Sequence, residues 1–135
     1  MKRSSYNNLQ EKIRSLKTPE IEVWENKYRD RDYLVKIETS EFTCICPRTG
    51  LPDFAALRIE YIPDKWCAEL KSFKLYLVSF RNVGIFHEHV TNRILDDFVK
   101  ACKPRYIKLE MEYNLRGGIK TSTKAEYKVK GYKLK

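Results

Sequence analysis

Residues 41–53 place two thiols and a carboxylate within one short segment that Pro and Gly divide into turns. Cysteine attacks electrophilic carbon as its thiolate, so a site of this kind must lower the pKa of the thiol, and Arg48 is a neighbour able to do so. One interpretation makes Cys46 a nucleophile with Asp53 as a nearby acid. In the other, the thiols of Cys44 and Cys46 are buried and act as small hydrophobic groups. Local sequence does not separate the two.

The spacing of the cysteines does not favour a zinc site or a redox-active disulfide. A zinc site needs four tetrahedral ligands, usually in closely spaced pairs. The available side chains lack that spacing: Cys44, Cys46, Cys67, Cys102, His87 and His89. A redox dithiol normally has two residues between its cysteines, whereas Cys44 and Cys46 have one. We therefore predict reduced thiols and no metal site.

Two further groups could bind a ligand. Glu88, after His87, is either a plain first-turn acid of a helix or an acceptor for paired N–H donors of a purine-like ring, with His87 bonding another ring heteroatom. Lys71 and Lys74 share a helix face, which is either solvated or holds the phosphates of a cofactor. No Gly-x-Gly-x-x-Gly follows a strand, so a Rossmann nucleotide site is excluded.

The elements that position these residues follow from the spacing of apolar side chains. Alternation predicts strands and a 3.6-residue period predicts helices. The expected strands are 33–39, 57–62, 107–113 and 125–129, with a turn at 116–118 before the last, and the expected helices are 69–80 and 87–103. This β-β-α-α-β-β order predicts an α+β fold in which two helices cover one face of an antiparallel four-stranded sheet.

Length and composition predict a single domain of 135 residues, with a core at 31–130 and an N-terminal extension at 1–30 that packs on the core or on a neighbouring subunit. The formal charge of +9 favours a polyanionic partner such as nucleic acid, a phosphate-bearing cofactor or an anionic membrane. No apolar run approaches the roughly 18 residues of a membrane span, and the N-terminus is too polar for a signal peptide. We expect a cytoplasmic protein without a membrane partner. The two open sheet edges favour a homo-oligomer.

Three motifs together resemble a known family. They are Cys46-Pro47-x-Thr49-Gly50-x-Pro52-Asp53-Phe54, Glu69-Leu70-Lys71-Ser72-Phe73-Lys74-Leu75-Tyr76, and Ser79-Phe80-Arg81-Asn82 followed by Phe86-His87-Glu88. In order and spacing, from about Tyr33 to Tyr127, they resemble the NADPH-dependent 7-cyano-7-deazaguanine reductases (the unimodular QueF type), oxidoreductases of queuosine biosynthesis in tRNA modification. The resemblance implies the tunnelling fold (T-fold) of GTP cyclohydrolase I, whose subunits join their sheets into rings, here pentamers and possibly decamers, with sites at subunit interfaces.

The resemblance also implies residue roles. Cys46 would attack the nitrile of 7-cyano-7-deazaguanine to form a thioimide, Asp53 would protonate the nitrogen, and two NADPH molecules would complete the reduction to the amine. The deazaguanine would be held by Glu88 and His87, in a pocket lined by Ala68, Glu69 and Leu70. Many members have Ser in place of Leu70, so only a backbone contact is expected there. The NADPH phosphates would bind Lys71 and Lys74.

Two other functions compete with this interpretation. A related branch of the fold attaches ammonia to the same nitrile on tRNA, as an amidinotransferase using the same cysteine without NADPH; the motif at 69–76 favours the reductase. The second alternative is a nucleic-acid-binding module that uses the lysines and nine tyrosines. The aromatic residues fall at core-facing positions, which favours packing over base stacking, so direct nucleic-acid binding is not expected.

Overall fold

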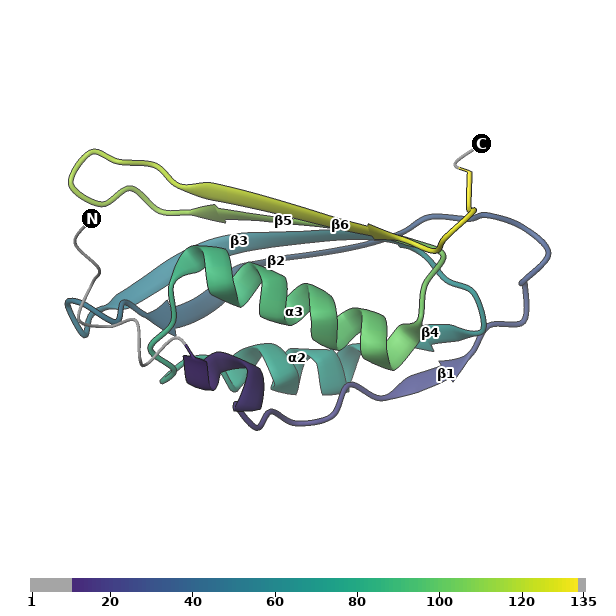
Figure 1. Ribbon diagram of the computed structural model, residues 1–135, viewed down its shortest axis with the longest axis horizontal. Coiled ribbons are helices and arrows are strands. Elements are labelled where there is room, and N and C mark those ends of the chain that lie inside the picture. The colour runs from purple at the N-terminus through teal and green to yellow at the C-terminus, as the bar shows by residue number, and fades with distance from the viewer. Residues whose placement is uncertain (1–10, 134–135) are drawn as a thin grey trace.

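The computed structural model describes residues 11–133, and in it a four-stranded sheet is covered on one face by two helices (Figure 1). In chain order the elements are the 3-10 helix η1 (Glu11–Ser15), β1 (Val23–Glu25), β2 (Val35–Ile45), β3 (Pro52–Ile62), β4 (Trp66–Ala68), α2 (Leu70–Val78), α3 (His87–Cys102), β5 (Tyr106–Tyr113) and β6 (Ser122–Lys128). The main sheet has the order β2-β3-β5-β6, with every pair antiparallel. The expected α+β architecture is confirmed.

Alternating side chains explain why these strands form one layer of the core. In β5, Ile107, Leu109, Met111 and Tyr113 are buried, while the residues between them are partly exposed. Helix α3 carries its buried residues at helical spacing and lies across this face, as the pattern predicts. The other face of the sheet carries charged residues such as Arg58, which pairs with Glu38 and Glu112 on the neighbouring strands.

The prediction of an irregular segment at 41–53 was wrong. β2 continues to Ile45 and β3 begins at Pro52, so the two strands form a long hairpin with a short loop at 46–51. Sequence alternation hid this because the register shifts by one residue between Thr39 and Phe42. Such a bulge changes which positions face the core.

A second, two-stranded sheet was also missed. β1 pairs antiparallel with β4, and each strand is only three residues long, too short for an alternation signal. This pairing ties the described part of the N-terminal extension to its own subunit, where Ile21 is buried. Residues 1–10 of the expected N-terminal extension lie outside the described residues.

Aromatic rings fill the space between the sheet and the helices. Phe98 of α3 makes edge-on contacts with Tyr61 of β3, at a centroid distance of 4.9 Å, and with Phe73 of α2, at 5.7 Å. Cys102 is also buried there, and burial raises the pKa of its thiol to about 12. Within residues 11–133, no helix is long and apolar enough to cross a membrane.

Candidate active site

Cys46 is the first residue after β2, at the tip of the β2–β3 hairpin. Its backbone closes the loop at both ends: its N–H donates to the Leu51 carbonyl, and its carbonyl accepts from the Gly50 N–H, each at 2.9 Å. Gly50 has φ of +71°, a left-handed conformation that glycine adopts without strain. The preceding Ile45 N–H donates to the Val83 carbonyl, which fixes the hairpin tip to the α2–α3 connection. The thiol is therefore carried on a well-defined loop.

The loop lowers the pKa of the Cys46 thiol. Burial acts to raise this pKa, and the Asp53 carboxylate adds to that effect. Hydrogen bonds from the Thr49 side chain and from the backbones of Thr49 and Arg48 act against them, and the net shift is downward. Arg48, expected to help through its charge, contributes through its backbone. Donors aimed at sulfur stabilise the thiolate, which is the nucleophilic form.

Asp53 is the buried acid of this region. The register places it opposite Cys44, and its side chain is 6% exposed. Its two oxygens have different partners: Oδ2 lies 3.0 Å from Nε2 of His87, and Oδ1 lies 2.9 Å from Nε of Arg116. A buried carboxylate with two such partners keeps one orientation.

His87 reaches Asp53 because α3 begins where the α2–α3 connection packs against the end of β2. Its ring stacks on the Tyr113 ring, with centroids 3.5 Å apart and planes 4° from parallel. Burial raises the pKa of the Tyr113 hydroxyl, and Glu88 is among the neighbouring charges that raise it further. Glu88 is exposed at the start of α3. The structure thus brings together Cys46, Asp53, His87 and Glu88.

Cys44 has the opposite character to Cys46. It is fully buried, and burial raises the pKa of its thiol to about 12, with Asp53 contributing in the same direction. The interpretation of a thiol acting as a small hydrophobic group fits Cys44.

Ala68, another expected site residue, lies near the opposite end of the sheet from Cys46. The Ala68 N–H donates to the Tyr61 hydroxyl at 3.1 Å. Tyr61 stands eight positions along β3 from Asp53, a separation of roughly 26 Å at about 3.3 Å per residue. In Figure 1 the β2–β3 hairpin tip and β4 lie at opposite ends of the molecule. One subunit therefore does not bring Ala68 to Cys46.

The start of α2 carries the remaining candidates. The Glu69 carboxylate caps the helix by accepting from the backbone N–H groups of Lys71 and Ser72, and the latter bond is the main cause that lowers the pKa of Glu69. Leu70 is 61% exposed. Lys71 and Lys74 are exposed and form no ion pair within the described part of the chain. Two ammonium groups on one helix face can pair with anionic groups such as phosphates.

The sequence offered no reason to assign a role to three residues near Cys46 and Asp53, namely Thr49, Tyr113 and Arg116. Tyr113 was assigned to a strand face without a role, and Arg116 was treated only as part of a turn. The one available signal was Arg116 itself, a charged side chain directly before two glycines that tighten the backbone. No group of three or more ligands that could hold a metal ion occurs among residues 11–133.

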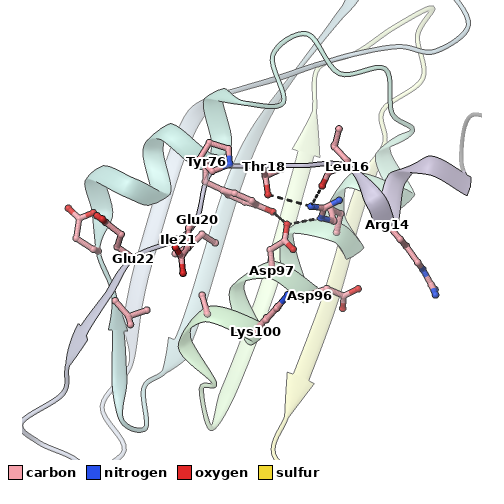
Figure 2. A pocket seen from close by; sticks show the side chains of 15 residues that line it. Arg14, Leu16, Thr18, Glu20, Ile21, Glu22, Tyr76, Asp96, Asp97 and Lys100 are labelled. Carbon is pink, nitrogen blue, oxygen red and sulfur yellow. Dashed lines mark hydrogen bonds and ion pairs between the residues drawn. The ribbon is translucent and has the colours of Figure 1, made fainter.

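A separate hollow lies between residues 14–23 and the two helices (Figure 2). Several polar groups that line it bond to one another or to the N-terminal segment. Arg93 pairs through Nε with Asp97 at 2.7 Å and donates to the Ile13 and Leu16 carbonyls, while the Tyr76 hydroxyl donates to Asp97. These bonds hold the N-terminal segment on α3.

Comparison with known proteins shows close relatives. The QueF-like protein family matches residues 52–132. A protein of Nitrosococcus oceani described as an NADPH-dependent 7-cyano-7-deazaguanine reductase is 54% identical over 113 residues, 84% of this chain and 88% of that protein. A Nitrosomonas europaea protein of the same description is 56% identical, over 84% of this chain and 81% of its own length.

A solved structure supports the fold. The apo crystal structure of the archaeosine synthase QueF-Like superposes with a TM-score of 0.65 at 27% identity, covering 69% of this chain and 91% of that one. The observed sheet and helices thus match a known T-fold arrangement.

Proposed function

This chain belongs to the QueF-like protein family, and from that premise we propose that it is an NADPH-dependent 7-cyano-7-deazaguanine reductase. It converts the nitrile of 7-cyano-7-deazaguanine to an aminomethyl group, the reduction that supplies queuosine biosynthesis. Identity above 50% to proteins of that description, over more than four fifths of the chain, carries the proposal. The acidified thiol of Cys46 beside the buried Asp53 agrees with it.

The first step is addition of Cys46 to the nitrile. The thiol proton passes to the Asp53 carboxylate, and the sulfur forms a bond to the nitrile carbon. One carbon–nitrogen π bond breaks, its electron pair moves to nitrogen, and nitrogen takes the proton back from Asp53. The product is a thioimide in which protons and electrons balance. Cys46 has the lowered pKa that this step requires, whereas Cys44 does not.

Lys71 and Lys74 are the residues of this chain that would hold the NADPH phosphates. Two NADPH molecules, bound in turn, would each supply one of the two hydrides that take a nitrile to an amine. After the first hydride, Cys46 would leave as its thiolate, so the same side chain would both activate the substrate and release it. Asp53, paired with His87, would pass to the nitrogen the proton that each later stage takes up from solvent.

The deazaguanine base would contact Glu88 and His87 on one side and the segment 68–70 on the other. Since Ala68 and Cys46 lie at opposite ends of one subunit, the two halves of the pocket must come from different copies. The Glu69 carboxylate already accepts two bonds as a helix cap, so backbone groups of this segment suit the base better than a free carboxylate would. Glu88 is exposed in one subunit and available to accept paired N–H donors.

The sheet itself supports assembly. Its edges β2 and β6 run in opposite directions, because four strands alternate, so β6 of one copy can pair antiparallel with β2 of the next. Apolar residues are exposed at these edges, including Leu34 beside β2 and Tyr127 in β6. A ring of copies, pentameric or a pair of pentamers, removes every open edge. Sedimentation velocity tests this point, and a stable monomer would contradict it.

One assay separates the reductase from the amidinotransferase branch, to which the archaeosine synthase similarity at 27% identity points. Purified protein is mixed with 7-cyano-7-deazaguanine and NADPH, and nicotinamide absorbance is followed. We expect two NADPH consumed per nitrile and no turnover in Cys46→Ala. An adduct on Cys46 without NADPH oxidation would favour the amidinotransferase, and neither signal in assembled protein would refute both.

A further inference from the structure

The turn between β5 and β6 directs one side chain, that of Arg116, toward Pro52 and Asp53 at the start of β3. Arg116 and Ile119 exchange backbone hydrogen bonds of 3.1 and 2.9 Å, which makes a tight bridge. Gly117 and Gly118 lie between them with φ of +57° and +78°, conformations that side chains other than glycine rarely adopt. The Arg-Gly-Gly sequence therefore fixes where Arg116 leaves the backbone.

Arg116 crosses from this turn to the neighbouring hairpin and makes two contacts there. Its Nη2 donates to the Pro52 carbonyl at 2.5 Å, and its Nε lies 2.9 Å from Oδ1 of Asp53. The planar guanidinium holds both acceptors at once. A third bond, from the Asn114 N–H to the Phe54 carbonyl at 3.0 Å, keeps the two loops in register. Residues 52–54 are thus held from the β5–β6 side.

The two oxygens of Asp53 face different elements as a result. Oδ1 is held by Arg116 and Oδ2 faces His87. With Oδ1 engaged, rotation of the carboxylate about its side-chain bond would break the ion pair. The Asp53 side chain is 6% exposed, whereas Arg116 is 41% exposed and approaches it from the solvent side.

We propose that Arg116 is a positioning residue for the addition step, holding the Asp53 carboxylate so that it can accept the Cys46 proton and return it to the nitrile nitrogen. This inference rests on the proposed function, because it assigns a role within that reaction. It concerns the step before any hydride transfer. Proton transfer is sensitive to misplacement of about 1 Å, which can cost roughly 10²-fold in rate.

The test measures thioimide formation alone, in the absence of NADPH, by stopped-flow absorbance and by intact mass. Arg116→Ala should slow adduct formation by roughly tenfold to 10²-fold. Arg116→Lys, which keeps the charge but cannot hold both acceptors in one plane, should recover part of the rate. Lys120→Ala is the matched control, because it removes one positive charge from the same β5–β6 turn, where Lys120 pairs with Glu112. The rate of adduct formation in this variant should match that of the wild type.

The outcomes separate the inference from the proposed function. If wild-type protein forms no adduct, the proposed function fails. If wild type forms the adduct and Arg116→Ala does so at the same rate, the positioning role is refuted, even if the KM for NADPH rises. A far-ultraviolet spectrum and sedimentation profile identical to wild type guard against misfolding. Should Arg116→Ala not assemble, Arg116→Gln retains a donor for Pro52, and an undiminished adduct rate in that variant would equally refute the role.

Discussion

The Thr49 hydroxyl is expected to set the reactivity of Cys46, and Thr49→Val removes it at nearly constant volume. Thr49 Oγ1 accepts from the Leu51 N–H at 3.2 Å, which leaves its proton free to point at the thiol. A hydrogen bond from Thr49 is the foremost influence that lowers the pKa of Cys46, against the opposing effect of burial. The thiolate is populated above this pKa and is lost as the pH falls through it.

The size of the effect follows from the type of bond. A hydrogen bond to a charged group contributes about 1.5–3 kcal/mol, and the lower end applies because Thr49 is exposed to solvent. About 1.4 kcal/mol corresponds to tenfold in an equilibrium, so at a pH below the thiol pKa the variant should hold about tenfold less thiolate. The acid limb of its reactivity profile should therefore move to higher pH.

The assay is alkylation of Cys46 by iodoacetamide across a pH series, quantified on the Cys46 peptide by mass spectrometry. It needs neither substrate nor NADPH, and the deeply buried Cys44 and Cys102 serve as internal slow references. Thr49→Ser keeps the hydroxyl and should retain the wild-type profile. Superimposable profiles for wild type and Thr49→Val would refute the assigned role of the hydroxyl and leave the backbone donors as the cause.

Three further predictions concern Asp53, the two lysines proposed to bind NADPH, and the contact of Arg93 with the N-terminal segment. Asp53→Asn should lower the rate of adduct formation by roughly 10²-fold or more in stopped-flow experiments, because it removes the proton acceptor. Lys71→Ala and Lys74→Ala should each raise the KM for NADPH by roughly threefold to fivefold in steady-state assays, with kcat unchanged. Arg93→Ala should lower the free energy of unfolding by about 3 kcal/mol in urea titrations, since it breaks a largely buried ion pair and frees two carbonyls. Lys100→Ala, on the same helix but exposed, should change it by less than about 0.5 kcal/mol.

The fold was largely predictable because the helices and central strands keep one apolar period over their length. Helix 87–103 was placed within one residue, since Val90, Ile94 and Phe98 mark its buried face and Pro104 its end. The ends of the β2–β3 hairpin were not predicted correctly. A bulge between Thr39 and Phe42 changes which residues of β2 face the core, so the alternation of apolar and polar residues is interrupted in the middle of the strand. The residue pattern of one strand does not reveal a register shift, because the shift depends on how the partner strand pairs with it.

The candidate site was predictable only for residues whose side-chain type is itself reactive or able to transfer protons. Cys46, Asp53 and His87 could be singled out from type and motif, and the structure brings them together. No role could be assigned to Arg116, or to Thr49 although it lies within the motif, because an arginine in a turn and a threonine in a loop are ordinary surface residues. Their roles depend on distance: Arg116 is 63 positions from Asp53 in sequence and 2.9 Å from it in space.

The two neighbouring thiols differ because the strand ends between them. Cys44 is an inward-facing residue of β2, where the sheet and α2–α3 connection exclude water and the Asp53 carboxylate lies opposite; each condition opposes a thiolate. Cys46 lies one residue past the last strand position, where a turn directs N–H and O–H donors inward instead of toward a partner strand. Ending β2 at Ile45 therefore decides which thiol can be the nucleophile. A shift of the strand end by two residues would bury Cys46 and leave the site without its reactive group.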